Sequence, residues 1–482
     1  MKDIYFRNVV LGLIIMGILL LIIKLFHGGI GDPDTWWHLA AGRYIVENGI
    51  IPKQDIFSWT LAGQPWITHE WLPEVFFYLA YLAGRFWGVL ALVLIVTVAL
   101  LVFYWRLLTL AQGSFVITAL TLLIVGELMY PFLQIRPQVL SYLFFVVFLY
   151  VLYLYVLEKR NYLFVLPVVS ILWVNSHGSF PLGPAVIFLF IACGLLRRDG
   201  ARIATYRLEA AQFRALGLVF VLCIAATVVN PNGLKLLVYP LDTVGDSLMM
   251  DNIQEWLSPD FHKLYAKLFL AYFLATFLVL VFTSRRIHLT DLVLFLVFST
   301  GAFIYGRFIA YALLVSGLLW PRYFHPALDF RLDLARLKLV SVPLVLALYV
   351  LVFALKAPPQ TPIDYRFANE ERYPVNALEH LEINPLNGRM FNQYGWGGYL
   401  IWNRPDEKVF IDGRADVYME QVFGDYLRIS QLKPEAAALL EDYRIDYVLM
   451  PADSALVQAL KLSPRWGIHY EDETAAILVK RE

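Results

Sequence analysis

Eleven stretches of the sequence are apolar over lengths close to that of a membrane-spanning helix. Of the 482 residues, 59% are hydrophobic and only 16% are charged, whereas about a quarter are charged in an ordinary soluble domain. The composition excludes a soluble enzyme, a coiled coil and a disordered chain. Since about 20 apolar residues cross a bilayer core, we predict a polytopic α-helical membrane protein. The approximate limits of the stretches are 8–26, 87–109, 115–133, 138–157, 161–175, 182–196, 215–230, 266–284, 289–305, 307–320 and 337–355.

The distribution of Lys and Arg predicts the orientation. The first stretch follows Lys2 and Arg7 and is too long for the apolar part of a signal peptide, so we expect an uncleaved span with the N-terminus in the cytoplasm. The predicted inner segments then carry sixteen Lys and Arg, and the outer segments before the C-terminal domain carry seven. Eleven spans place the C-terminus outside. The apolar stretch 70–84 is too short to cross, and we expect an interfacial helix there; a span at 70–84 would reverse every later loop.

Beyond residue 356 the composition changes to that of a soluble domain. A Pro-Pro-Gln-Thr-Pro linker begins at 358, and the strands that we expect after it are 388–392, 409–412, 445–450 and 475–479, with helices between them. We therefore predict two domains, a transmembrane domain over 1–356 that includes an outer loop at 28–86, and an extracytoplasmic α/β domain over 357–482. The net charge of +0 gives no attraction to nucleic acid.

The first outer loop carries two carboxylates, Asp32 and Asp34, directly after a span and beside several tryptophans. A carboxylate that is partly desolvated there has a raised pKa and can serve as a general base. The alternative is a turn in which Asp34 caps a helix over 36–48. Capping needs only one carboxylate, and the two interpretations are compatible.

The same loop contains residues that could bind a divalent metal. Asp34 and His38 lie four positions apart and share a helix face, and His69 and Glu70 follow at the end of the loop. A polar network that holds the loop is the alternative, because no compact zinc signature is present. The sequence establishes no cofactor, and a divalent metal ion is the cofactor that these residues could bind.

Other polar and aromatic residues are expected on the outer side. Arg136 and Arg307 suit a lipid phosphate or pyrophosphate, or extend to headgroups. Asn175 and His177 could bind a substrate or satisfy a turn. Trp36 and Trp37 could stack on a sugar or isoprenoid, although an interfacial aromatic belt accounts for most of the loop's tryptophans. In the C-terminal domain, Asp412, Arg414 and Asp416 form either a ligand site or a salt-bridge cluster.

These features resemble the GT-C superfamily of integral-membrane glycosyltransferases, and more specifically a bacterial branch of GT-C-like proteins. The first-loop stretches that carry the resemblance begin with Asp-Pro-Asp-Thr-Trp-Trp-His-Leu at 32–39 and continue at 49–52, 55–58 and 69–72. Later stretches are Arg-Pro-Gln at 136–138, Asn-Ser-His-Gly at 175–178, Tyr-Gly-Trp-Gly-Gly-Tyr-Leu at 394–400 and Phe-Ile-Asp-Gly-Arg at 410–414. The resemblance covers nearly the whole chain.

The resemblance implies an inverting transfer of a sugar from a polyprenyl-phosphate donor to a glycan, lipid or protein acceptor. It would take place on the outer face of a bacterial cytoplasmic membrane, in contact with membrane lipid. Asp34 or Asp32 matches the base, Arg136 or Arg307 would meet the phosphate, and monophosphate donors in the family are not thought to need a metal. The alternative is a non-catalytic GT-C-fold subunit that binds polyprenyl lipid or scaffolds an envelope assembly. A transporter is disfavoured, because the sequence lacks a symmetric pair of broken spans.

Overall fold

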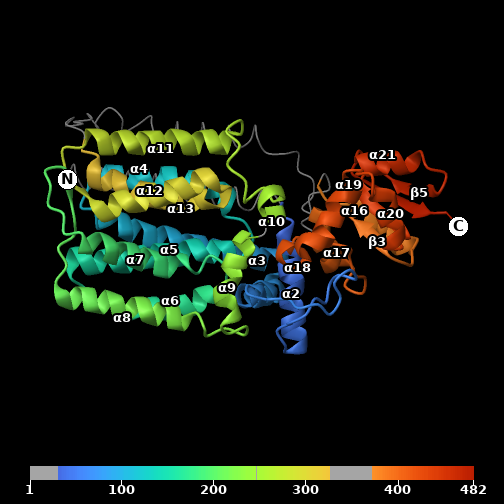
Figure 1. Ribbon diagram of the computed structural model, residues 1–482, viewed down its shortest axis with the longest axis horizontal. Coiled ribbons are helices and arrows are strands. Elements are labelled where there is room, and N and C mark those ends of the chain that lie inside the picture. The colour runs from blue at the N-terminus through green and yellow to red at the C-terminus, as the bar shows by residue number, and fades with distance from the viewer. Residues whose placement is uncertain (1–30, 246, 326–371, 482) are drawn as a thin grey trace.

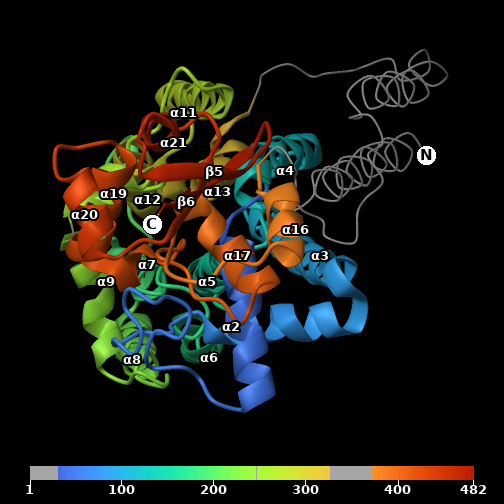
Figure 2. The same cartoon turned by 90° about the vertical axis from the view of Figure 1, so that its right-hand side faces the viewer.

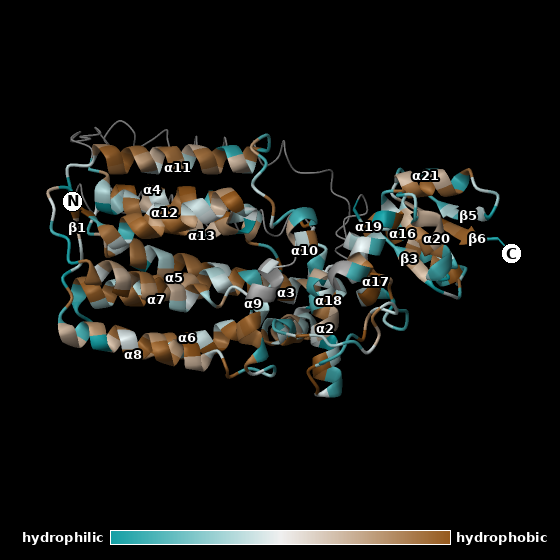
Figure 3. Cartoon of the chain, in the orientation of Figure 1, coloured by the Kyte–Doolittle hydropathy of each residue, from teal (hydrophilic) through white to brown (hydrophobic). Residues whose placement is uncertain are grey.

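A bundle of helices forms one end of the molecule, and a small sheet with flanking helices forms the other (Figure 1). The computed structural model describes residues 31–245, 247–325 and 372–481. Apolar residues dominate the bundle along its length (Figure 3). Its helices are α3 (Trp71–Thr109), α4 (Phe115–Met129), α5 (Gln138–Glu158), α6 (Val165–Val174), α7 (Leu182–Leu195), α8 (Ala210–Ala226), α11 (Leu264–Phe282), α12 (Leu289–Ile304) and α13 (Ile309–Tyr323).

Among the described residues, four helical segments are long and apolar enough to cross a membrane. They are Trp71–Thr109, Phe115–Phe132, Gln138–Glu158 and Leu264–Phe282, and α6, α7, α8 and α12 are shorter apolar helices. By the length and composition of these helices, the chain is a membrane-embedded protein. The predicted spans 8–26 and 337–355 lie outside the described residues, so the total of eleven spans and their orientation stay predictions.

A break divides α3 where the sequence predicted the end of a short helix. Gly84 and Arg85 leave the helical conformation, and Arg85 has a φ of 53°. Immediately after the break Gly88 packs on the carbonyl of Ala80, where a Cβ atom would come within 2.0 Å of that oxygen. The two segments of α3 therefore run in different directions (Figure 2), and residues 71–83 do not extend the second segment.

Helix α2 (Asp34–Asn48) begins one residue earlier than a cap at Asp34 would require, so the capping interpretation is wrong. Pro33 precedes the helix, and the Asp34 side chain caps no backbone group at its start. Instead, the backbone N–H of Asp34 donates to Oδ1 of Asp32 at 2.9 Å. Asp32 thus fixes the entry into α2, and the Asp34 carboxylate is left for other contacts.

The C-terminal sheet has the order β3-β4-β6-β5, with β3 parallel to β4 and the other pairs antiparallel. Three of the four predicted strands are present, but the prediction of a strand at 409–412 is wrong. Val409 forms a single bridge to Ser58 in the first outer loop, and the Asn392 side chain accepts from the N–H of Phe410. The strand β5 escaped prediction because it lies at the sheet edge and only one of its six residues is buried. The strands are β3 (Met390–Asn392), β4 (Tyr447–Pro451), β5 (Trp466–Glu471) and β6 (Ala475–Lys480).

The first outer loop and the C-terminal part share one hydrophobic core. Trp36 is fully buried and packs edge-on against Phe86, Tyr373 and Tyr399. Helix α17 (Gly397–Asn403) lies against α2, and a Cβ at Gly398 would come within 2.8 Å of the Pro33 carbonyl oxygen. The belt interpretation is therefore wrong for the buried Trp36, Trp37 and Trp66. The predicted domain boundary at 356/357 lies outside the described residues.

A buried ion pair joins helices at the opposite end of the bundle. The Asp291 carboxylate lies 2.7 Å from Nη1 of Arg322 and accepts hydrogen bonds from the hydroxyls of Tyr153, Tyr206 and Tyr323. Replacing Asp291 with Asn is expected to lower the free energy of unfolding by about 3 kcal/mol, because it leaves a buried guanidinium without a counter-ion. Unfolding of the purified protein in detergent measures this loss.

Asp199→Asn is the matched control, because Asp199 pairs with Arg207 and Arg286 at the same end of the bundle but is exposed. An exposed pair contributes less than about 1 kcal/mol. Equal losses of stability in the two variants would contradict the assignment of Asp291 and Arg322 as a structural pair.

Candidate active site

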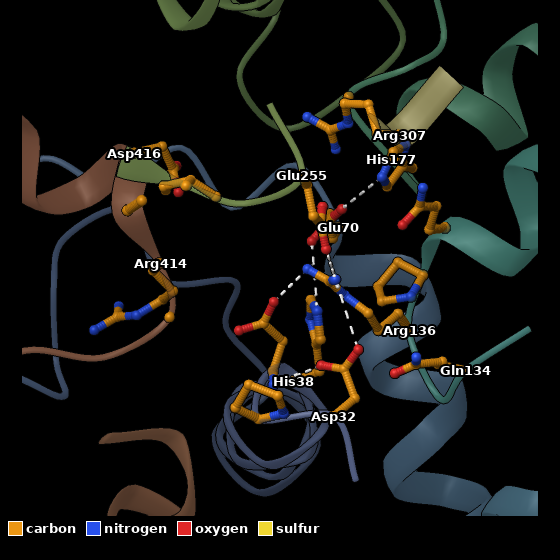
Figure 4. A pocket seen from close by; sticks show the side chains of 18 of the residues that line it. Asp32, His38, Glu70, Gln134, Arg136, His177, Glu255, Arg307, Arg414 and Asp416 are labelled. Atoms are coloured by element: carbon orange, nitrogen blue, oxygen red, sulfur yellow. Dashed lines mark hydrogen bonds and ion pairs between the residues drawn. The ribbon is translucent and has the colours of Figure 1, made fainter. Parts of the chain in front are cut away.

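A cavity of about 1140 Å³ lies where the bundle meets the first outer loop and the C-terminal part. The start of α2, the loop before α3, the loop before α5 and the loop after α6 form its walls, together with residues from 239–240, 249–256 and 305–311. The C-terminal part closes it with Gln393, Tyr394 and residues around 413–427. Segments that are far apart in the sequence therefore place their polar side chains around one space (Figure 4).

Arg136 lies at the centre of a group of three carboxylates. Its guanidinium donates to Asp34 and to Glu255 and lies 3.6 Å from Oδ2 of Asp32. The loop that carries Arg136 is anchored to α2, because the Thr35 hydroxyl donates to the carbonyl oxygen of Ile135 at 2.9 Å. The structure thus brings together the predicted residues Asp32, Asp34 and Arg136, and it adds Glu255, to which the sequence assigned no role.

The Asp34 carboxylate is held on several sides. Oδ1 accepts from Nε1 of Trp37 at 3.1 Å, and the other oxygen accepts from Arg136. Burial raises the pKa of Asp34 to about 7; the carboxylates of Asp32 and Glu255 act in the same direction, and Arg136 acts against it. Gly413 approaches so closely that a Cβ there would fall 2.0 Å from Oδ1 of Asp34. Asp34 is therefore a carboxylate that changes charge near neutral pH, beneath a loop of the C-terminal part.

Arg307 supplies a second cation to the cavity. Its guanidinium lies over the ring of Trp256, 4.1 Å from the ring centroid, and its backbone N–H donates to the carbonyl oxygen of Glu255. No carboxylate of the described residues lies within ion-pair distance of the Arg307 guanidinium. Arg307 is thus a positioned cation whose charge is available to an anionic ligand (Figure 4).

A second polar group in the cavity combines imidazoles and carboxylates. His38 in α2 lies 3.1 Å from Oε1 of Glu74 and 3.7 Å from Oε2 of Glu70. Nε2 of His69 and Nε2 of His177 lie 3.8 and 3.7 Å from the other oxygen of Glu70. The structure thus brings His38, His69 and Glu70 together, as the proposed metal set required, whereas Asp34 belongs to the group around Arg136.

Glu74 was missed by sequence reasoning. It lies four residues after Glu70, so both carboxylates share one face of the first turns of α3. The i, i+4 spacing after a histidine–glutamate pair was the available signal. The apolar residues around Glu74 obscured it.

Two predicted binding residues lie outside the cavity. The Asn175 side chain accepts from Nε1 of Trp71 at 2.8 Å and donates to the carbonyl oxygens of Ile171 and Val229, so it ties α6 to α3. Trp36 is part of the shared core described above. His177 and Trp37 do line the cavity, and the Nδ1 atom of His177 is hydrogen-bonded to the Ser179 hydroxyl.

The acidic and basic residues of 412–416 separate into two groups. Arg414 is buried and pairs with Asp412 and Asp55 at 2.6 and 2.7 Å, while the Tyr418 hydroxyl donates to Asp412. This is the salt-bridge cluster that the sequence allowed, and it fastens the C-terminal part to the first outer loop. Asp416 is not part of that cluster and lines the cavity (Figure 4).

Comparison with known proteins identifies the fold. No family model and no curated protein matches the sequence. The structure is similar to the archaeal oligosaccharyltransferase AglB from Archaeoglobus fulgidus in complex with an inhibitory peptide and a dolichol-phosphate, with a TM-score of 0.57 and 12% identity over 98% of this chain and 74% of that one. A second structure of that enzyme, tethered to an acceptor peptide containing the NVT sequon, gives a TM-score of 0.53 and 12% identity over 99% and 74% of the two chains.

A mutant of the mycobacterial arabinofuranosyltransferase AftD is also similar, with a TM-score of 0.52 and 13% identity over 99% of this chain and 42% of that one. AglB is an oligosaccharyltransferase and AftD is an arabinofuranosyltransferase. The structural similarity confirms the fold that the resemblance to the GT-C superfamily implied. This chain has the GT-C fold.

Proposed function

We propose that the protein is an inverting glycosyltransferase that moves a sugar from a polyprenyl-phosphate donor to an acceptor hydroxyl or amide. One observation carries the proposal: the buried Asp34 carboxylate, with a pKa of about 7, shares a cavity with Arg307, which has no carboxylate partner among the described residues. A base near neutral pKa and a cation for the leaving phosphate are the two groups that this reaction needs. The binding of dolichol-phosphate by AglB supports the choice of donor.

In the proposed reaction Asp34 accepts the proton of the acceptor as the acceptor atom attacks the anomeric carbon. The new glycosidic bond forms as the bond from that carbon to the phosphate oxygen breaks, and the phosphate leaves with the electron pair. The configuration inverts because the displacement is a single step. Arg307 stabilises the charge that develops on the phosphate.

Arg136, Asp32 and Glu255 position the base. Arg136 holds one oxygen of Asp34, and Asp32 fixes the backbone of Asp34 at the start of α2. Burial keeps the pKa of Asp34 high enough for proton transfer, and the carboxylates of Asp32 and Glu255 add to this effect and oppose that of Arg136.

The setting of the reaction follows from the sequence. We propose that the cavity opens on the outer face of a bacterial cytoplasmic membrane, with the N-terminus in the cytoplasm. The transmembrane domain would cover 1–356 and the extracytoplasmic domain 357–482. The acceptor would be a glycan, a lipid or a protein. The purified protein with a panel of polyprenyl-phosphate sugars, assayed for released polyprenyl phosphate, tests the activity directly.

The activity is expected to depend on pH through Asp34. Because the base acts in its deprotonated form and its pKa is about 7, kcat/KM should rise with pH and level off above about pH 8. Asp32→Asn removes a like charge that raises the pKa of Asp34, so the rising limb should move to lower pH. A profile that is flat from pH 5 to 8, or a limb that moves upward in Asp32→Asn, would contradict the assignment.

A non-catalytic lipid-binding subunit is the second candidate. The observation that favours it is that Asp34 is already engaged by Arg136 and Trp37 and covered by Gly413. Copurified polyprenyl lipid without turnover across the whole donor panel would support this function and exclude the transferase.

A further inference from the structure

Hydrogen bonds satisfy only part of the group of imidazoles and carboxylates beside the proposed base, in which Nδ1 of His38 lies 3.1 Å from Oε1 of Glu74. His38, Glu70 and Glu74 each present a ligand atom, and these atoms lie within 4.8 Å of one another. Oε2 of Glu74 is buried and has no hydrogen-bond partner. An unpartnered carboxylate oxygen at such a depth is costly unless another group satisfies it.

The distances around Glu70 indicate the same missing partner. Three imidazoles, those of His38, His69 and His177, approach its carboxylate at 3.7 to 3.8 Å. These separations are too long for hydrogen bonds. They are close to the distance of about 3.4 Å that separates two ligands of one tetrahedral ion with bonds of about 2.1 Å.

Rigid elements hold the candidate ligands in place. Glu70 and Glu74 lie at the start of α3, and His38 lies on α2. One turn after His38, Gly42 packs directly on α3, where a Cβ atom would fall 2.0 Å from the carbonyl oxygen of Glu74. The close helix contact at Gly42 therefore fixes the spacing of His38 and Glu74, as a preformed metal site requires.

We propose that His38, Glu70 and Glu74 bind one divalent transition-metal ion of the Zn²⁺ or Mn²⁺ class. Two carboxylates balance the charge of a divalent ion, and a neutral imidazole favours these ions over Mg²⁺ and Ca²⁺. The ligands line the cavity, so the ion keeps open positions toward a bound substrate, with His69 and His177 beside it.

Metal binding by the full-length protein in detergent tests the proposal, without a sugar donor. The protein is stripped with a chelator, dialysed, and incubated with Zn²⁺, Mn²⁺, Mg²⁺ or Ca²⁺ alone. Bound metal is measured by mass spectrometry and thermal unfolding is followed. We expect about one equivalent of Zn²⁺ or Mn²⁺ with a raised midpoint of unfolding, and at least a tenfold weaker affinity in His38→Gln and Glu74→Gln.

Glu47→Gln is the matched control, because Glu47 joins α2 to α3 through the Tyr78 hydroxyl away from the three ligands, and it should retain the metal. Co²⁺ added to the wild-type protein gives a second readout that does not depend on any variant. Ligation of Co²⁺ by nitrogen and oxygen atoms produces visible absorption bands. Absence of bound metal and of these bands, or metal retained by folded His38→Gln and Glu74→Gln, would overturn the proposal. Because no donor is used, failure here is distinct from failure of the transferase assignment.

Discussion

Asp34→Asn is expected to lower the rate of sugar transfer by about 10²- to 10⁴-fold while the protein remains folded. The loss has this size because general-base catalysis contributes such a factor, and an amide has no basic oxygen with a pKa near 7. Asn retains the shape of Asp and can still accept from Nε1 of Trp37. Initial rates with a saturating donor, together with unfolding in detergent, separate loss of the base from loss of the fold.

Asp32→Asn and Glu255→Gln are the controls for Asp34→Asn, because both remove a carboxylate from the same guanidinium. Neither residue is proposed to take the proton, so each is expected to retain more than a tenth of the wild-type rate above pH 8. Transfer at the wild-type rate by Asp34→Asn would exclude Asp34 as the base. A loss as large in Asp32→Asn as in Asp34→Asn would show that the pair acts as one unit.

The sequence was sufficient to predict a helical membrane protein and to single out Asp34 as a candidate. Apolar runs of spanning length and glycine or proline at their ends predict helices from local information, and α5 and α11 follow their runs within two residues. Asp34 and Arg136 were each recognised as polar residues at the ends of spans. Their contact was not predictable, because it joins residues that are 102 positions apart in the sequence.

Other features could not be predicted from the sequence because they depend on tertiary packing. Trp36 has the composition of an interfacial belt residue, but Tyr373 and Tyr399 from the C-terminal part bury it. The run 409–412 has the composition of a strand, yet Asn392 and the first outer loop take up its backbone groups. Both errors have one cause: the outer loop and the C-terminal part fold against each other, and neither sequence alone contains that information.

The shared core has a consequence for the site, because it couples the C-terminal part to the base. Arg414 and Asp412 pair with Asp55 of the first outer loop, and Gly413 between them covers Asp34. A side chain at this position would displace the Asp34 carboxylate, because its Cβ would fall 2.0 Å from Oδ1 of Asp34. The C-terminal part is thus a wall of the cavity, and its residue Asp416 faces the same space as the bundle's cations.

Arg307→Gln is expected to lower kcat by about 10²- to 10³-fold, because it removes the cation proposed to stabilise the departing phosphate. Arg307→Lys should recover part of the rate, since it restores the charge without the planar fork that binds two phosphate oxygens. Single-turnover rates with a polyprenyl-phosphate sugar measure the loss, and the affinity for the donor, measured separately, should fall less than kcat.

Arg43→Gln provides a matched control for the stacking contribution of Arg307. The Arg43 guanidinium lies 4.6 Å from the ring centroid of Trp402, much as Arg307 lies over Trp256, but Arg43 is not among the residues that line the cavity. If the loss in Arg307→Gln came from the lost cation–π contact and local packing, Arg43→Gln should destabilise the protein to a similar extent and Arg307→Lys should recover the rate fully. A kcat loss confined to Arg307→Gln, at unchanged stability, assigns the effect to the phosphate.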